Sequence, residues 1–333
     1  VEVVGYGVQK KISVIGSQQT IATKELKVPV ANLTQGLAGR VSGLVSVQRT
    51  SEPGFDDANI YIRGISTLTA SMSAPLTLVD GVPRSFSNVD PEDIESFSIL
   101  KDASATAVYG VRGANGVIII NTKSGLKGRP KFSVRYTEGL TKPTKITDFA
   151  DGATYMEMSN EASLTRGGGK LYSQEIIDKT RRGEDPYLYP DVDWMDRFMK
   201  KSSVVQRYNV SVRGGTERVR YYASVGYVDN SGLYNVDKNA NTYKTNANYE
   251  NYSLRGNVDI NVTKKFVISL DIASLMAKWN YPGAYSNSTS RILNALTQTP
   301  PNAHPIFNED GSLSGTSQYL NNPYGSVSYT HLR

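Results

Sequence analysis

The alternation of apolar and polar positions divides the chain into two stretches of different character. Up to about residue 125 the apolar runs are short and of mixed period, which is typical of a small α+β unit. After it, five segments alternate apolar and polar residues, as in strands whose two faces meet different surroundings. These strands are predicted near residues 131–138, 204–213, 219–228, 252–262 and 265–275.

Local signals in the first stretch predict individual elements. Asn32 is a good N-cap, and apolar residues at a spacing of four predict a helix over Asn32–Leu44. The Asp80-Gly81 dipeptide between apolar residues predicts a tight hairpin turn. Asp90 followed by Pro91 predicts a short capped helix that runs into a strand.

A glycine-rich stretch, "DASATAVYGVRGANGVIIINTKSG", covers Asp102–Gly125. Glycines beside an apolar strand are typical of dinucleotide-binding folds, in which the strand precedes the glycines and a helix follows them. Here the helix-forming residues come first and the strand comes last, with G-x-x-G-x-x-G spacing. We therefore interpret Gly110, Gly113 and Gly116 as a tight turn from a short helix into a strand, and not as a phosphate site.

The connections between the alternating strands follow an order. Gly214–Arg218 and Val262–Lys265 are short turns, whereas Leu140–Ser202, Asp229–Asn251 and the stretch from Ala277 onward are long. Transmembrane barrels of the bacterial outer membrane alternate short periplasmic turns with long external loops. The order favours such a barrel, with a soluble β protein as the alternative. Partial helical periodicity predicts short helices within the long loops.

Composition narrows the function classes. Among 333 residues there is no cysteine, which excludes a disulfide framework and a thiolate metal site. The net charge of +6 comes without a block of like charges, so we expect no nucleic-acid partner. The 21 tyrosines suit a membrane interface or a sugar-binding cleft equally well. No run reaches the roughly 18 apolar residues of a membrane-spanning helix.

Candidate catalytic residues are few. The two histidines, His304 and His331, have no metal-spaced partner, and we expect both to be exposed loop residues. Two pairs of neighbouring carboxylates are expected to be helix caps or solvated loop residues: Asp56/Asp57 and Glu92/Asp93. The sequence predicts no catalytic, metal or cofactor site, so we expect the protein not to be an enzyme.

Five motifs occur in order over about 120 residues: "VVGYGVQKK", "LTQGLAGRVSGLVSVQ", "ANIYIRGIST", "PLTLVDGVP" and "DIESFSILKDASATAVYGVRGANGVIIINTKSG". Together they closely resemble the plug domain of SusC/RagA-type TonB-linked outer-membrane proteins, the TonB-dependent receptors. Val111 stands where the family usually has a small residue or serine, and Gly113 where it often has alanine.

The resemblance implies a fold and a domain order. It implies a TonB-box-like segment and linker over 1–9, an α+β plug domain over 10–125, and the first strands of an antiparallel transmembrane β-barrel over 126–333. The family barrel has about 22 strands, so we expect this chain to be a fragment of a longer protein.

The resemblance also implies a function. It implies TonB-dependent active import of oligosaccharides or peptides across the bacterial outer membrane, with a SusD-like surface lipoprotein as partner and outer-membrane lipid around the barrel. An adhesion or signal-transducing receptor without transport is the alternative on the same scaffold. A soluble enzyme, in contrast, would be found in the aqueous fraction without detergent.

Two groups of residues are the site predictions. Val1, Glu2, Val3 and Val4 occupy the TonB-box position, where a β-prone segment would bind TonB by strand addition. The polar residues of the plug motifs are expected to make contacts within the plug or with the barrel lumen. The plug-motif residues are Arg63, Gly64, Asp80, Gly81, Lys101, Asp102, Tyr109, Gly110, Gly113, Asn115 and Gly116.

Overall fold

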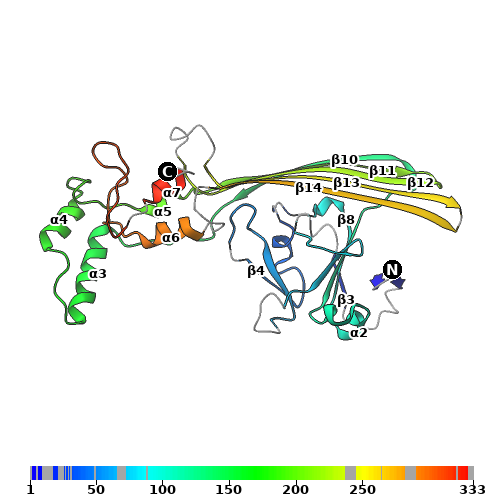
Figure 1. Cartoon of the computed structure of the whole chain (residues 1–333), viewed down its shortest axis with the longest axis horizontal. Helices are drawn as coiled ribbons and strands as arrows, with labels where there is room; N and C mark the ends of the chain where they lie inside the picture. Colours follow the sequence, from blue (N-terminus) through cyan, green and yellow to red (C-terminus); the bar gives the residue numbers. More distant parts are fainter. Residues whose placement is uncertain are drawn as a thin grey trace. The chain divides into compact units, whose positions relative to one another are not determined.

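The computed structural model separates the chain into two compact units (Figure 1). The first comprises Val1–Gly139, Val204–Asn230 and Tyr249–Lys278, and the second comprises Leu140–Ser203, Ser231–Asn248 and Trp279–Arg333. The structure describes residues 2–4, 7–9, 18–21, 26, 28, 30, 32–48, 50–65, 73–87, 89–236, 245–263, 265–281, 290–319 and 322–328.

A mixed five-stranded sheet, in the order β3-β8-β9-β6-β7, is the centre of the N-terminal part of the first unit. We call residues 18–125 the plug. Only β6 and β9 run parallel, and the other neighbours are antiparallel. A separate antiparallel pair is formed by β4 and β5. The strands are β3 (Gln18–Ile21), β4 (Leu44–Gln48), β5 (Ala58–Ile62), β6 (Leu76–Val79), β7 (Val82–Pro83), β8 (Ile94–Leu100) and β9 (Val117–Thr122).

Turn chemistry explains two of these connections. Asp80 and Gly81 both have positive φ, 52° and 78°, which gives the tight hairpin between β6 and β7 predicted from the sequence. The Asp90 carboxylate accepts a hydrogen bond from the Glu92 amide and caps the 3₁₀ helix η4 (Pro91–Asp93), which leads directly into β8. The short capped helix predicted there is confirmed.

The helix predicted over Asn32–Leu44 is wrong. Only the single 3₁₀ turn η2 (Gln35–Leu37) forms. Gly39 and Gly43 have φ of 70° and 71°, so the backbone leaves the right-handed helical region twice. The apolar positions that suggested a helix are nevertheless buried, because the turns direct them into the core.

The core of the plug is apolar on both faces of its central strand. In β9, Val117, Ile118 and Ile120 are fully buried, as expected for a strand covered on both sides. One cluster joins this strand to the turns and strands before it. Its members are Ile21, Leu26, Leu33, Leu37, Val41, Leu44, Ile60, Ile62, Val79, Phe86, Ile94, Phe97, Ile99, Ile118 and Ile120.

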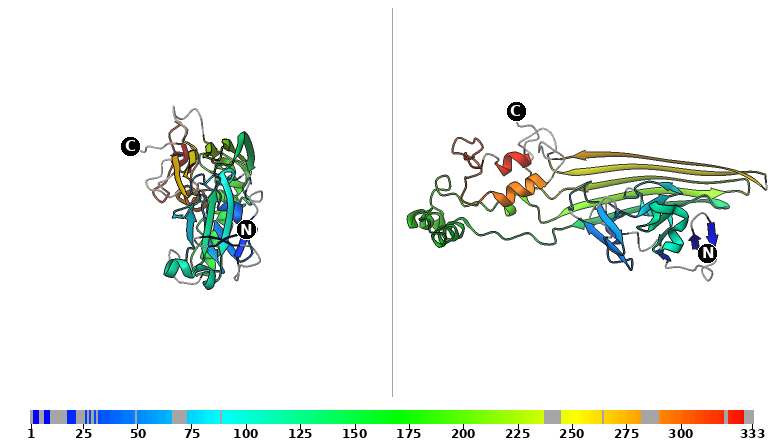
Figure 2. Two further views of the ribbon diagram at one scale, coloured as in Figure 1. Left: turned by 90° about the vertical axis from the view of Figure 1, so that its right-hand side faces the viewer. Right: turned by 60° about the horizontal axis from the view of Figure 1, so that its bottom comes forward.

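A second sheet completes the first unit. It is a continuous meander in the order β10-β11-β12-β13-β14, which we call the wall sheet. Figure 1 and the right view of Figure 2 show it as a long curved layer with the plug on one side. The antiparallel sheet predicted from the alternating segments is thereby present. Its strands are β10 (Gly128–Thr141), β11 (Ser203–Gly215), β12 (Val219–Ser231), β13 (Asn248–Thr263) and β14 (Phe266–Asn280).

The second unit, which we call the loop unit, is made of the long connections between these strands. The helices predicted in the loops are present, and α3 packs against α4. Trp194, Phe198, Ile292 and Leu296 belong to an apolar core of this unit. Among the described residues, no helix is both long and apolar enough to span a membrane. Its helices are α3 (Gly152–Thr165), α4 (Gln174–Arg182), α5 (Trp194–Phe198), α6 (Ser290–Gln298) and α7 (Pro323–Ser328).

Candidate functional site: a buried polar interface between plug and wall sheet

The central strands of the wall sheet bury polar side chains and expose apolar ones. In β11, Arg207 and Asn209 are buried, whereas Tyr208 and Val210 are 41% and 49% exposed. In β12, Ser224 is buried and Val225 is 58% exposed. This is the reverse of a water-soluble sheet, and it is the pattern of strands with lipid outside and a polar interior. The plug covers the polar face.

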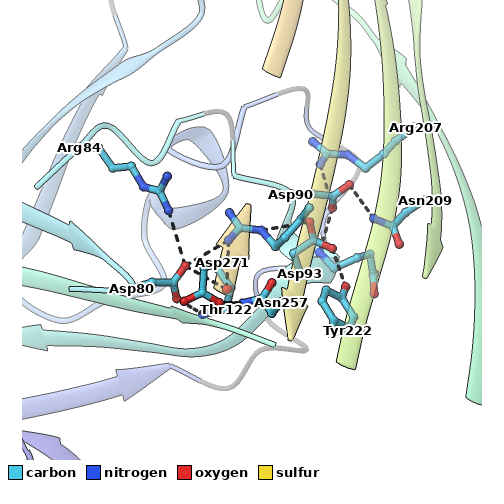
Figure 3. A network of polar contacts seen from close by, with 12 residues as sticks. Asp80, Arg84, Asp90, Asp93, Thr122, Arg207, Asn209, Tyr222, Asn257 and Asp271 are labelled. Carbon is cyan, nitrogen blue, oxygen red and sulfur yellow. Dashed lines mark hydrogen bonds and ion pairs between the residues drawn. The ribbon is translucent and has the colours of Figure 1, made fainter. Parts of the chain in front are cut away.

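Asp90 joins the plug to β11. Its carboxylate faces the Arg207 guanidinium at 3.3 Å and accepts a hydrogen bond of 3.1 Å from the Asn209 amide (Figure 3). Arg207 also donates to the Val30 carbonyl at 2.6 Å. Both members of the ion pair are almost fully buried, with side chains 10% and 4% exposed. The residue that caps η4 therefore also attaches the plug to the wall sheet.

Arg255 of β13 makes a second attachment. Its Nη1 lies 3.1 Å from Asp80 Oδ2 and 3.1 Å from Thr122 Oγ1, and its Nε lies 3.7 Å from Asp93 Oδ2. The other Asp93 oxygen accepts a 2.6 Å hydrogen bond from the Tyr222 hydroxyl (Figure 3). One buried arginine thus neutralises two carboxylates that come from different turns of the plug.

Burial sets the electrostatics of these acids. It raises the pKa of Asp93, and the Tyr222 hydroxyl and the Arg255 charge oppose that effect. Glu92 is also buried, and Arg135 of β10 lies 2.9 Å from it. The expectation that Glu92 and Asp93 are only caps or solvated loop residues is therefore wrong. Buried charges must be paired, and the wall sheet supplies their partners.

Asp56 is a further buried acid at this interface. It is 4% exposed and accepts a 2.6 Å hydrogen bond from the Gln35 amide, and the Asn230 amide of β12 lies 3.5 Å away. Burial raises the pKa of Asp56 to about 6. Its neighbour Asp57 is exposed, so the prediction of solvated loop residues holds for one member of the pair only.

The plug-motif residues predicted from the sequence fall into separate places. Asp80 is in the interface just described. Arg63, which has a positive φ of 61°, forms an ion pair with Asp102. Lys101 donates to the Gln19 side chain at 2.7 Å and to the Ser42 carbonyl. Burial, and then the Arg63 charge, lower the pKa of Lys101. These last contacts lie within the plug.

The glycine-rich turn is structural. The helix before it is a short α2 (Ala103–Thr106) that continues as the 3₁₀ segment η5 (Ala107–Gly113), kinked at Gly110 with φ 58° and ψ −146°. Gly116 has φ 89°, and a Cβ there would lie 2.6 Å from the Ile62 side chain. Gly116 is therefore required both by its backbone conformation and by close packing.

Of the remaining motif residues, Tyr109, Gly113 and Asn115 lie in this glycine-rich segment, whereas Gly64 follows β5. Tyr109 packs on an apolar cluster that includes Leu100 and Ile119. The Asn115 side chain lies 3.5 Å from the Ala74 carbonyl. Gly64 has φ 98°, and Gly113 leaves no room for a Cβ, which would lie 2.8 Å from the Thr106 carbonyl oxygen.

The predicted TonB-contact segment forms a small hairpin. Strand β1 (Glu2–Val4) pairs antiparallel with β2 (Gly7–Gln9), so that Val3 lies opposite Val8. Val1 is outside the described residues. Among the described residues, β1 pairs with β2 alone.

The expectation for His304 is wrong. It is only 2% exposed, its Nδ1 lies 2.8 Å from the Pro305 carbonyl oxygen, and its ring meets the Trp194 ring edge-on at 5.3 Å. His304 is thus part of the packed interior of the loop unit. The other histidine, His331, lies outside the described residues.

A row of tyrosines crosses the exposed face of the wall sheet. Tyr136, Tyr208, Tyr227 and Tyr252 come from four successive strands, and their ring centroids are 4.8, 6.0 and 4.8 Å apart. The Lys278 ammonium lies 5.7 Å from the last ring. Aromatic rows of this kind flank the apolar band of outer-membrane barrels.

Comparisons with known proteins agree with this geometry. The family model of the TonB-dependent Receptor Plug Domain matches residues 10–117. TonB-dependent receptor P26 of Formosa agariphila is 29% identical over 98% of this chain and 31% of its own length. TonB-dependent receptor SusC of Bacteroides thetaiotaomicron is 29% identical over 99% of this chain and 31% of its own length.

A solved structure extends the likeness to the fold. The RagAB peptide importer in its open-open state matches 97% of this chain and 38% of its own chain, with a TM-score of 0.74 and 27% identity. The chain belongs to the TonB-dependent receptors of the SusC/RagA type. It spans about a third of the length of the relatives that it matches. The plug and wall sheet are thus the plug domain and first barrel strands of such a receptor.

Sequence reasoning missed most of the receptor's plug–wall interface. Asp90 was recognised only as a cap, and Arg207, Tyr222 and Asn209 were assigned no partner. The available signal was the placement of charged residues such as Arg255 on the polar face of an alternating strand. A charge on the inner face of a barrel strand requires a partner inside, and the acidic turns of the plug were the nearest source.

Proposed function

We propose that this chain is the plug and part of the barrel of a TonB-coupled importer in the bacterial outer membrane, which takes up oligosaccharides or peptides. The observation that carries the proposal is the buried polar interface. Asp80, Asp90 and Asp93 attach the plug to the wall through Arg207 and Arg255. A polar interface can be wetted when the plug moves, because both sides then find water as a partner.

We assign the contact with TonB, through which energy would reach the plug, to the segment Val1–Val4. The outer membrane has no nucleotide supply, so the plug must be moved from the periplasmic side. Val1, Glu2, Val3 and Val4 are β-prone and precede the plug directly, and β1 is short with a single partner strand. Strand addition to TonB would use the backbone of these residues.

Relatives support the substrate class and the partner. RagAB is a peptide importer, and SusC is a TonB-dependent receptor. We propose that the full-length parent of this chain likewise imports its substrate with TonB as the source of energy. A SusD-like lipoprotein would close the barrel from outside. The plug-motif residues Arg63 and Asp102 then hold the plug together between transport cycles.

Deletion of Val1–Val4 in the full-length parent tests this function. Uptake of the cognate oligosaccharide or peptide by intact cells is expected to fall to background, while the amount of receptor in the outer membrane stays unchanged. Replacing Val3 by proline is expected to have the same effect because it removes a backbone donor, whereas Val3→Ala keeps the backbone and is the matched control. Unchanged uptake after the deletion would refute TonB coupling through this segment.

A further inference from the structure

The loop unit contains a cavity that has no part in the plug–wall interface. Its volume is about 680 Å³, enough for a short peptide or a small sugar. One wall is a face of α3 that includes Tyr155, Met158 and Ala162. The other walls are the segments 191–194 and 296–301.

Hydrogen bonds join these walls to one another. The Gly152 amide at the start of α3 donates to Asp191 Oδ1 at 2.7 Å. The Val192 amide donates to the Pro301 carbonyl at 2.9 Å, and the Trp194 indole donates to the Pro300 carbonyl at 3.2 Å. The cavity is therefore held open by the fold of the unit, and its shape is fixed before any ligand binds.

The lining combines exposed apolar groups with acids. Phe149 and Met158 are 49% and 61% exposed, far more than the buried side chains of the same unit. Asp151, Asp191 and Asp193 lie among them, and all three are exposed. Among the described residues that line the cavity there is no lysine, arginine or histidine.

Each of these carboxylates keeps acceptor capacity. Asp151 Oδ1 accepts from the Thr154 amide, and Asp193 Oδ1 accepts from the Asp196 amide. A carboxylate has two oxygens and about four acceptor sites, so these capping bonds leave room for a ligand's donors. The Thr154 hydrogen bonds, and more weakly the Arg181 charge, lower the pKa of Asp151, which keeps it ionised at neutral pH.

We propose that this cavity is a substrate-binding subsite for the cationic, apolar end of a peptide. An apolar side chain would occupy the space beside Phe149 and Met158, and an ammonium or guanidinium group would meet the carboxylates. This inference rests on the proposed function, because a bound peptide is a substrate only if the receptor imports it. It favours peptide over acidic oligosaccharide, because uronate or sulfate groups would meet three like charges.

Binding to the purified full-length parent in detergent tests the subsite. The probes are a fluorescently labelled Lys-Leu-Phe-Gly-Gly peptide, its Glu-Leu-Phe-Gly-Gly analogue and maltohexaose. The lysine peptide is expected to bind at least tenfold more tightly than the glutamate analogue, and this ratio is expected to shrink as salt is raised. Equal binding of the two peptides would overturn the proposal.

Two variants localise the binding. The triple variant Asp151→Asn, Asp191→Asn, Asp193→Asn keeps every capping acceptor, since asparagine caps as well as aspartate, but removes the charge. It is expected to reduce the tenfold preference to less than about twofold. Asp310→Asn is the matched control, because Asp310 also accepts from a backbone amide in this unit and lies outside the cavity.

Ala162→Trp fills the space from an exposed helical position and is expected to abolish binding of the lysine peptide. Unaltered thermal unfolding of this variant shows that the fold is kept. Peptide binding that survives Ala162→Trp would overturn the assignment to this cavity. Maltohexaose binding that Ala162→Trp removes, without peptide binding, would assign the cavity to a neutral sugar and also overturn the proposal.

The outcomes separate this inference from the proposed function. Uptake that is indifferent to deletion of Val1–Val4 would refute TonB coupling through this segment while leaving a peptide site intact. TonB-dependent uptake with no charge preference in peptide binding would refute the subsite and leave the importer standing.

Discussion

The plug sheet and the wall sheet have five strands each. The plug sheet buries mainly apolar side chains, whereas the central strands of the wall sheet bury polar ones. The plug buries Val117, Ile118 and Ile120 in its central strand, and the wall sheet buries Arg207 and Arg255. The plug is built by removing apolar surface from water, at roughly 25 cal/mol per Å². The wall sheet is built for surroundings that are apolar outside and polar inside. The central strand of the plug is therefore buried on both faces, whereas the central wall strands alternate between buried polar and exposed apolar residues.

The proposed function requires a plug that stays folded while it moves against the wall sheet. The apolar core cluster of the plug is made of plug residues alone. The contacts between plug and wall include charge pairs and hydrogen bonds, each of which has water as an alternative partner. Breaking a few of them in sequence costs less than exposing an apolar seam of the same size.

The largest expected effect comes from breaking the interface at its centre. Arg255→Ala leaves Asp80 and Asp93 with their main charge partner removed, and such a loss costs about 3–5 kcal/mol. We expect the plug of the variant full-length receptor to be cleaved faster in limited proteolysis and to unfold at lower urea concentration. Arg182→Ala removes an exposed pair with Glu184 and should cost less than about 1 kcal/mol.

A rescue variant makes this prediction sharper. Adding Asp80→Asn and Asp93→Asn to Arg255→Met removes the charge of Arg255 together with those of its two carboxylate partners, and much of the stability should return; Arg84, the other partner of Asp80, is 40% exposed and keeps water as a partner. Failure of the triple variant to recover would show that Arg255 acts through packing and not through charge.

The exposed face of the wall sheet gives the second test. Val225 in β12 is 58% exposed, so in water Val225→Arg would be harmless. Facing lipid, the same change costs about 2–4 kcal/mol near the midplane of the bilayer. We expect less folded variant receptor in the outer membrane, measured by heat-modifiable gel mobility. The control Val111→Arg, at a plug position 93% exposed, should leave that amount unchanged.

The sequence predicted what depends on neighbours along the chain. Alternation of apolar and polar residues located the wall strands, and the Asp80-Gly81 dipeptide located a hairpin. Both signals are carried by adjacent residues, so the sequence shows them directly. The helix over Asn32–Leu44 failed because Gly39 and Gly43 adopt positive φ that apolar spacing does not reveal.

The partners of the interface could not be predicted, because they are far apart in sequence. Arg255 and Asp80 are separated by 175 positions, and Tyr222 and Asp93 by 129. The carboxylates were recognised as helix caps, and Asp90 is one, but capping leaves other oxygen lone pairs for the wall. The burial of Asp56 and His304 likewise depends on distant segments that pack over them.

Protonation of Asp56 gives a third, smaller effect. Its pKa rises from 3.8 to about 6 on folding, so the folded protein holds this proton more tightly than the unfolded chain does. The group therefore stabilises the fold most below pH 4, and that contribution is lost as the pH rises through 6. The loss amounts to at most about 3 kcal/mol.

Asp56→Asn tests this contribution, since asparagine is neutral throughout. The difference in unfolding free energy between variant and wild type is expected to grow in favour of the variant from pH 4 to pH 7. Asp57→Asn, at the exposed neighbouring position, should give a clearly smaller change with pH. A flat difference for Asp56→Asn would show that folding leaves the pKa of Asp56 unchanged.

The smallest expected effect comes from replacing two glycines, one in the apolar core of the plug and one in the polar interface with the wall. Gly116 has φ 89°, and a Cβ there would lie 2.6 Å from Ile62 Cδ1 and 3.1 Å from the Leu100 carbonyl oxygen, so Gly116→Ala must strain the backbone and displace a packed core. We expect a cost of about 1–3 kcal/mol in urea unfolding. Gly226 lies in the polar interface, where a Cβ would meet the Ser253 hydroxyl, which can rotate away, and would lie 3.1 Å from Asp90 Oδ2, which must shift by a few tenths of an ångström. Gly226→Ala should therefore cost less than about 1 kcal/mol. Equal costs would mean that the polar interface is packed as rigidly as the apolar core, and the plug could not then be released by wetting its contacts one at a time.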